Sequence, residues 1–260
     1  MRLLYPIVQA NIYSTSVEVI RKQTRLTIGP NGYSDKNDDE TSRGKITHLS
    51  RKSLSRLAFL AREATAKMSS MLTLTYGDPY PNNGAYVKQH LNYFLTTLRK
   101  NYPSVEYLWF MEFQKRGAPH IHICLNFDPN DLDRHAVAFY WAAGVAQNWE
   151  PMSLLAGETK RRLFDNMFKV HRHIDQWQVV KKVDGIARYV TKYSAKPEQK
   201  TVPIEFRDVG RFWGNSRGLK PVPVVSDVDM TENELREYLE AHGRDMQNYE
   251  ILPRYVWLID

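Results

Sequence analysis

The order of secondary-structure elements in this sequence predicts an α+β fold, with helices flanking a central antiparallel β-sheet. The strongest observation is a hairpin over residues 105–127, where two runs rich in branched and aromatic residues are separated by a short polar turn. A second observation is that apolar residues recur at helical spacing before and after this hairpin, as amphipathic helices packed on a sheet require. The whole order is strand, helix, strand, strand, helix, strand, helix, which matches the split βαβ, ferredoxin-like arrangement.

The individual elements lie between residues 45 and 220, which we expect to form one domain. An amphipathic helix begins at Ser50 or Ser53, because apolar residues recur at helical spacing after them. Residues 71–76 alternate like a strand, and Gly77-Asp78-Pro79 closes it. The later elements are expected in the order helix, hairpin, helix, strand and helix: 85–100, 105–127, 131–149, 176–180 and 184–196.

The two ends of the chain are predicted to be extensions of this domain. Residues 1–44 combine short β-prone pieces, such as 12–20 and 24–28, with an exposed acidic loop. Residues 221–260 begin as a Pro-containing linker and continue into a helix, because Thr231 and Glu234 have the spacing of a capping box.

Composition and charge narrow the range of functions. The chain has 260 residues, a formal net charge of +7 and one cysteine. The positive charge favours an acidic partner, nucleic acid first and an anionic membrane surface second. A single cysteine excludes an internal disulfide framework, and no apolar run approaches the length of a transmembrane helix, so we expect no membrane partner. The sequence also lacks a Gly-x-x-x-x-Gly-Lys-Ser/Thr phosphate loop and a secretion signal, so we expect a cytoplasmic protein that is not an ATP-driven motor of that kind.

A candidate metal site lies on the predicted hairpin. His120 and His122 share one face of their strand, because successive side chains point to opposite faces. With the turn centred near Arg116, Glu112 lies roughly opposite His120 on the neighbouring strand. Two imidazoles and one carboxylate on one face can hold a divalent metal ion. A second pair, His171 and His173, has no such acid nearby, and we interpret it as ordinary.

The last predicted helix of the domain carries two phenols and two ammonium groups on one side. Tyr189, Lys192, Tyr193 and Lys196 fall within an arc of about 100° on a helical projection. A tyrosine with its usual pKa near 10 is a poor nucleophile at neutral pH, and a nearby cation favours the phenolate. Together with a metal that polarises a phosphodiester, this helix suggests phosphoryl transfer through a covalent phosphotyrosine.

Several basic residues are candidates for contact with nucleic acid. Residues 43–67 hold seven basic residues and one acid, which suits a phosphate-contacting face, although a solvated helix face explains the same pattern. Residues 211–218 combine two arginines and a tryptophan in a glycine-containing loop, which suits phosphate contact and base stacking; packing of Phe212 and Trp213 under the sheet is the alternative. The candidates are Arg51, Lys52, Arg56, Lys115, Arg116, Arg211, Trp213 and Arg217.

With these residues in place, the sequence resembles the HUH endonucleases, and specifically the two-tyrosine rolling-circle replication initiators of single-stranded DNA phages and related plasmids. The strand at 71–76 is similar to their first motif, His120-Ile121-His122 is their His-hydrophobic-His motif, and 189–196 has their duplicated Tyr-x-x-Lys pattern. The segment 211–218 is also similar to one in the phage-type members. The resemblance covers roughly residues 45–220.

The resemblance implies a reaction and its participants. Glu112, His120 and His122 would hold one Mg²⁺ or Mn²⁺ ion at the scissile phosphate of single-stranded origin DNA. One tyrosine would attack, leaving a 5′-phosphotyrosyl bond and a free 3′-hydroxyl that primes a host DNA polymerase, and the second would act when the displaced strand is resealed. Lys192 and Lys196 would stabilise charge beside the two tyrosines. A host helicase would unwind the duplex in the cytoplasm of a bacterial cell.

Other functions remain open at this point. A transposase or relaxase would use the same chemistry, although no further histidine follows closely after His122, as the usual three-histidine relaxase site requires. A non-catalytic DNA-binding module would keep the fold without needing Glu112 or either tyrosine. A metal-dependent oxygenase would use two histidines and a carboxylate, but it would explain neither the tyrosine–lysine helix nor the basic charge.

Overall fold

The chain divides into two compact units, each with its own antiparallel sheet. One unit is Lys45–Lys220, and the other combines Met1–Gly44 with Pro221–Asp260. The computed structural model describes residues 7–14, 16–20, 49–63, 68–78, 80–128, 133–147, 165, 174–179, 202–244 and 254–257.

The larger unit is built on a five-stranded sheet in the order β6-β3-β5-β4-β7, with every neighbouring pair antiparallel. Strand β5 is therefore the middle strand and pairs along its whole length with β3 and β4. The strands are β3 Ser70–Thr75, β4 Tyr107–Phe113, β5 Pro119–Leu125, β6 Ile174–Val179 and β7 Trp213–Asn215.

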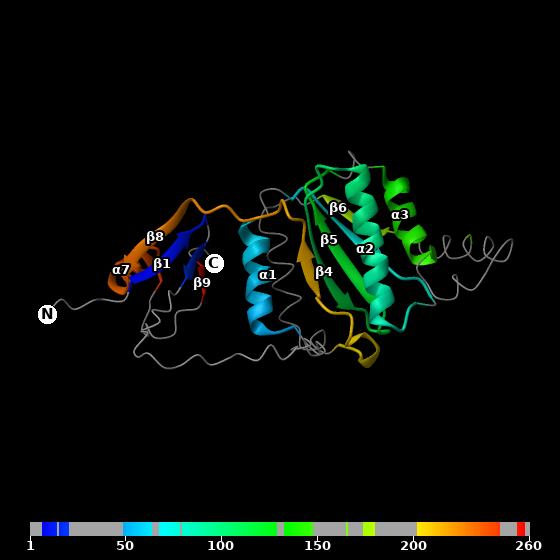
Figure 1. Ribbon diagram of the computed structural model, residues 1–260, viewed down its shortest axis with the longest axis horizontal. Coiled ribbons are helices and arrows are strands. Elements are labelled where there is room, and N and C mark those ends of the chain that lie inside the picture. The colour runs from blue at the N-terminus through cyan, green and yellow to red at the C-terminus, as the bar shows by residue number, and fades with distance from the viewer. Residues whose placement is uncertain are drawn as a thin grey trace, which may run out of the picture. The chain divides into compact units, whose positions relative to one another are not determined.

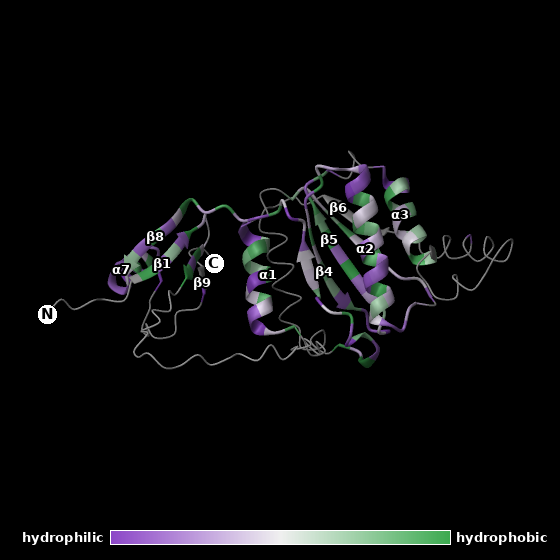
Figure 2. Ribbon diagram, viewed as in Figure 1, coloured by the Kyte–Doolittle hydropathy of each residue, from purple (hydrophilic) through white to green (hydrophobic). Residues whose placement is uncertain are grey.

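Helices cover both faces of this sheet (Figure 1). The helices α2 (Gly84–Asn101) and α3 (Arg134–Gln147) pack on one face, where Leu72, Ile121 and Ile123 join the larger apolar core. The opposite face receives α1 (Arg51–Glu63) over a smaller cluster that includes residues of β3, β4 and β5. Figure 2 shows the corresponding alternation of hydrophilic and hydrophobic residues along α1 and α2. The central antiparallel sheet flanked by helices is therefore the α+β architecture expected from the sequence.

The predicted elements of this unit agree with the structure to within a few residues wherever it describes them. The side chain of Ser50 accepts a hydrogen bond from the backbone N–H of Ser53 (3.2 Å), so the first of the two proposed start points caps α1. The interpretation of residues 211–218 as a loop was wrong in part, because β7 extends the sheet beside β4. The helix predicted at 184–196 lies outside the described residues.

The smaller unit joins the two ends of the chain in a four-stranded antiparallel sheet, in the order β8-β1-β2-β9. The sequence analysis treated these ends as separate extensions and placed a linker where β8 lies. It also joined two strands in one piece at 12–20. The strands are β1 Ile7–Ile12, β2 Ser16–Ile20, β8 Val225–Thr231 and β9 Tyr255–Trp257.

One helix, α7 (Glu232–Ala241), covers one face of this smaller sheet. Its Leu235 and Leu239 pack against Val8, Ala10 and other apolar residues of β1 and β2. The predicted capping box is confirmed, because the Thr231 and Glu234 side chains each bond the other residue's backbone N–H. No helix in the described parts of either unit is long and apolar enough to cross a membrane.

The buried thiol of Cys124 gives a test of how α1 is held on the sheet. Cys124 is fully buried beneath α1, and burial raises its pKa to about 12. At pH 8 only about one thiol in 10⁴ is then ionised, and the thiolate is the reactive form. We expect a disulfide reagent such as DTNB to leave the native protein unmodified for hours and to label one thiol at once in denaturant. Because the chain has one cysteine, rapid labelling of native protein would contradict a closed α1–sheet interface.

Candidate metal centre

The register of the β4–β5 hairpin brings a carboxylate and two imidazoles to one face of the sheet. Glu112 lies directly opposite His120, as the sequence predicted. His122 is two residues further along β5, opposite Phe110 of β4 and Thr73 of β3, so its side chain lies on the same face. This is the face that α1 covers, since Phe110 belongs to the apolar cluster beneath that helix.

The turn that fixes this register lies at residues 114–118. The backbone N–H of Gln114 donates to the carbonyl of Ala118 (2.9 Å), and Gly117 adopts a positive φ of 85° that a residue with a Cβ rarely tolerates. Arg116 is exposed but held: its guanidinium donates to the carbonyl of Tyr76 and to the Gln114 side chain, and it lies 5.0 Å from the centre of the Tyr80 ring. Arg116 therefore ties the hairpin turn to the end of β3.

His122 is the best-anchored member of the group. Its Nε2 lies 3.4 Å from Oε2 of Glu112, and its Nδ1 lies 3.1 Å from the hydroxyl of Thr73. Its ring stacks on Phe110 at an interplanar angle of 27°, and the ring centres of His120 and His122 are 4.8 Å apart. His122 and Glu112 are only 3% and 9% exposed, whereas His120 is partly exposed. One donor atom of each of two buried side chains thus meets on this face.

The donor set fits a divalent cation. Oε1 of Glu112 is buried and has no hydrogen-bond partner among the described residues, which costs roughly 1–3 kcal/mol unless a ligand satisfies it. The 3.4 Å between Nε2 and Oε2 is long for a charge-assisted hydrogen bond. It is close to the separation of two ligands that share one ion, since two bonds of about 2.1 Å at a tetrahedral angle place their ends roughly 3.4 Å apart.

The third ligand is not yet in place. Within the described ranges, no three His, Cys, Asp or Glu side chains are gathered closely enough to hold a metal ion. Binding by Glu112, His120 and His122 together would therefore require a side-chain adjustment, for which the partly exposed His120 has the most room. The metal-binding roles of these three residues stay a prediction.

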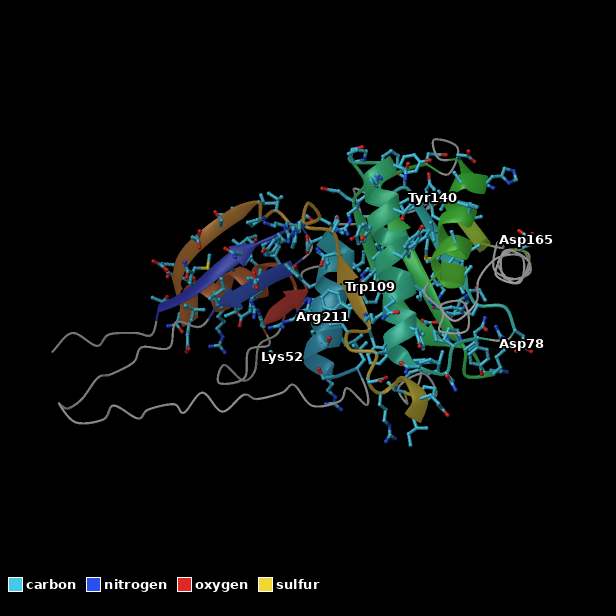
Figure 3. All side chains as sticks on the ribbon, turned by 45° about the vertical axis from the view of Figure 1, so that its right-hand side comes forward. Lys52, Asp78, Trp109, Tyr140, Asp165 and Arg211 are labelled. Carbon is cyan, nitrogen blue, oxygen red and sulfur yellow. The ribbon has the colours of Figure 1, made fainter. Side chains whose placement is uncertain are left out.

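The basic candidates divide into exposed cations and packed residues. Arg51, Lys52 and Arg56 are exposed on α1, and Lys52 can be followed in Figure 3. Lys115, Arg211 and Arg217 are exposed as well. These positions leave their charges open to a polyanion, but no described contact tests such binding.

Trp213 has a packing role that its place in the sequence did not reveal. It is partly buried against the cluster beneath α1, and its indole N–H donates to the hydroxyl of Ser53 (2.8 Å). This bond joins the edge strand β7 to the first turn of α1. Packing, which was the alternative to base stacking, therefore describes its contacts in this structure.

Sequence reasoning missed Lys88, which connects α2 to the segment before β7. Its ammonium donates to the carbonyl of Arg211 (2.6 Å) and lies 4.2 Å from the centre of the Trp109 ring; Trp109 and Arg211 are labelled in Figure 3. Burial, and secondarily the charge of Arg211, lowers the pKa of Lys88 to about 8. A lone lysine on a helix gave no signal, because its partners are far away in the sequence.

The predicted nucleophiles and their lysines cannot be placed relative to this centre. Tyr189, Lys192, Tyr193 and Lys196 lie outside the described residues. The nearest described element before them is β6, which pairs with β3 on the side away from β5.

Comparison with known proteins identifies the family. Residues 69–198, half of the chain, match a family model described as a replication-associated protein of the ORF2 type. The chain is thus a replication-associated protein with an antiparallel α+β domain. It belongs to this ORF2-type family.

Other comparisons are weaker. A solved structure of the N-terminal nuclease domain of non-structural protein-1 from minute virus of mice is similar to 50% of this chain over 73% of its own length, at 8% identity and a TM-score of 0.31. That domain is described as having Zn²⁺ coordination in its active-site pocket and as recognising DNA at an origin of replication. A similarity of this size supports no conclusion about the present chain. No curated protein sequence matches it.

The bond between Trp213 and Ser53 predicts a coupled loss of stability. Trp213→Phe keeps an aromatic ring but removes the indole N–H, and Ser53→Ala removes the acceptor. Each change should lower the free energy of unfolding by about 1 kcal/mol, measured by urea denaturation. The double variant should lose much less than the sum of the two, because the same bond is removed twice. Fully additive losses would show that the two side chains do not interact in solution.

Proposed function

We propose that this protein initiates rolling-circle replication by nicking single-stranded origin DNA with a tyrosine nucleophile and a divalent metal, and that it later rejoins the strand. The observation that carries the proposal is the β4–β5 register, which sets Glu112 opposite His120 with His122 beside them. The family supports it, because a replication-associated protein that carries metal-ligand side chains on its central strand needs them for a reaction on DNA.

The residues of the centre would bind and orient the scissile phosphate. When Mg²⁺ or Mn²⁺ is bound, it supplies charge stabilisation to the phosphate oxygens. A donor set with two imidazoles favours Mn²⁺ over Mg²⁺, which prefers oxygen ligands. Glu112, His120 and His122 are the proposed ligands.

The predicted tyrosine helix would carry out the transfer. The phenol oxygen of Tyr189 or Tyr193 attacks phosphorus, the bond to the 3′-oxygen breaks, and a 5′-phosphotyrosyl link forms. The phenol loses one proton and the 3′-oxygen gains one, so the step is balanced. Lys192 and Lys196 would favour the phenolate and stabilise developing charge. The phosphodiester energy is kept in the covalent link, so rejoining by the reverse reaction needs no ATP.

The partners follow from the products. A free 3′-hydroxyl is a primer, so the reaction requires a DNA polymerase, which we propose comes from a bacterial host cell together with a helicase. The setting would then be the host cytoplasm. An oxygenase would leave the match to replication-associated proteins unexplained. A transposase or relaxase, and a DNA-binding module without chemistry, would each give a different result in the assay that follows.

A covalent-adduct assay tests the chemistry. The full chain is mixed with labelled single-stranded DNA carrying the replicon's origin, with Mn²⁺ or EDTA, and resolved on a denaturing gel. A labelled protein band should form only with Mn²⁺ and should disappear in the double variant Tyr189→Phe/Tyr193→Phe, because no phenol remains. Loss in one single variant would name the first nucleophile. DNA binding without a band in any metal would favour the non-catalytic module.

The carboxylate has its own test in the same assay. Glu112→Gln keeps the size of the side chain but removes the charge that a cation requires. We expect adduct formation to fall at least 100-fold while binding of single-stranded DNA in EDTA stays within a few-fold of wild type. Asp78→Asn, on an exposed position after β3, is the control and should behave like the unmodified chain. Full activity in Glu112→Gln would remove this residue from the proposed metal site.

The exposed cations of α1 predict a change in salt dependence. Each phosphate contact contributes about −0.7 to the slope of log affinity against log salt for single strands. Lys52→Gln should reduce the magnitude of the slope by roughly this amount, and Arg51→Gln/Lys52→Gln/Arg56→Gln by up to about 2. Lys100→Gln is the matched control, since Lys100 is exposed on α2, across the sheet from α1. Equal slopes in the Lys52 and Lys100 variants would mean that α1 makes no phosphate contact.

A further inference from the structure

Strand β3 carries two threonines that face the two histidines of β5. The antiparallel register sets Thr73 opposite His122 and Thr75 opposite His120. Both threonines therefore lie on the face of the candidate metal centre. Their hydroxyls differ: Thr73 Oγ1 lies 3.1 Å from Nδ1 of His122, whereas Thr75 Oγ1 is buried with no hydrogen-bond partner among the described residues.

We propose that Thr73 is a positioning residue, which holds His122 through Nδ1 so that Nε2 is left to bind the metal. The inference rests on the proposed metal-binding role of Glu112, His120 and His122. A neutral imidazole has one N–H donor and one acceptor nitrogen, and the partner of one nitrogen decides the role of the other. With the proton on Nδ1 and donated to Thr73, the lone pair of Nε2 is directed toward the side where Glu112 lies.

The geometry favours this arrangement over the opposite tautomer. If Nε2 carried the proton, its natural acceptor would be Oε2 of Glu112, but the 3.4 Å between them is long for that bond. On the other side of the ring, the 3.1 Å to Thr73 is within the range of a normal hydrogen bond. The ring cannot easily turn away, because Phe110 stacks on it and the residue is 3% exposed.

A threonine suits this position because its hydroxyl can accept as well as donate. It can accept from Nδ1 when a cation is present and donate to the same nitrogen when the cation leaves and the proton moves to Nε2. Thr73 is itself 1% exposed, so water does not replace it readily. A valine there would keep the β-branched shape and leave Nδ1 without this partner.

The test measures binding of Mn²⁺ alone to the full chain, by the loss of the free-ion electron paramagnetic resonance signal, with no DNA or turnover. Thr73→Val should weaken Mn²⁺ binding by about 10–100-fold, the usual effect of removing the partner of a metal-bound histidine. Thr73→Ser should restore affinity to within a few-fold, because it restores the hydroxyl. Thr75→Val is the matched control: it makes the same change two residues along the same face, where no hydrogen bond is lost, and should leave affinity unchanged.

A measurement on the unaltered chain covers the case in which Thr73→Val does not fold. In the Zn²⁺-loaded protein, two-bond ¹H–¹⁵N spectra report which ring nitrogen of a histidine carries the proton, and His122→Gln identifies the signals of His122. A proton on Nδ1 is expected, and a proton on Nε2 would overturn the inference.

The outcomes also separate the two proposals. If wild type binds Mn²⁺ and Thr73→Val binds it equally well in the folded state, the role of Thr73 is wrong and the metal centre stands. If wild type binds no Mn²⁺ and Glu112→Gln changes nothing, both are wrong. Equal weakening by Thr73→Val and Thr75→Val would assign the effect to packing of β3 and would also overturn the role of Thr73.

Discussion

The antiparallel register between β4 and β5 is the constraint on which the candidate centre depends. A shift of one residue would send Glu112, His120 and His122 to the other face of the sheet, because side chains alternate. Ile121 and Ile123 are fully buried against α2 and α3 and oppose such a shift, since the same slip would expose them and bury the histidines in the large core. The apolar core therefore specifies the polar site by occupying the other half of the same strand.

The face that carries the centre is divided between packing and chemistry. Toward one end, Leu108 and Cys124 pack beneath α1, and toward the hairpin turn the same strands present Glu112 and His120. Burying a carboxylate and an imidazole at this border costs stability unless each finds a partner. Thr73 partners His122, and one oxygen of Glu112 is left over. Such a local violation of good packing is expected where a ligand completes the set.

Patterns within short windows predicted much of this architecture, and pairings between distant segments lay beyond them. The hairpin and the Glu112–His120 pairing followed from period-2 alternation and one turn. The helix at Thr231 followed from its capping box. Strand β7 and the pairing of β1 with β8 join residues more than 90 positions apart in the chain, and β8, with Asp227 and Asp229 exposed on a sheet edge, lacks the alternation that marks a half-buried strand. Thr73 gave no signal because its role exists only once β3 is set beside β5.

The division into two units also explains how the positive charge is used. Lys45–Lys220 holds 27 Lys and Arg against 15 Asp and Glu, whereas the two terminal segments together hold 9 against 14. The net charge of +7 is thus the difference between a sheet unit near +12 and a terminal unit near −5. Long-range attraction to a polyanion depends on the charge of the surface that faces it, and it is screened within about 10 Å at 0.1 M salt. Attraction to nucleic acid is therefore concentrated in the unit that carries Glu112, His120 and His122, where the charge would bring a phosphate to the residues proposed to act on it.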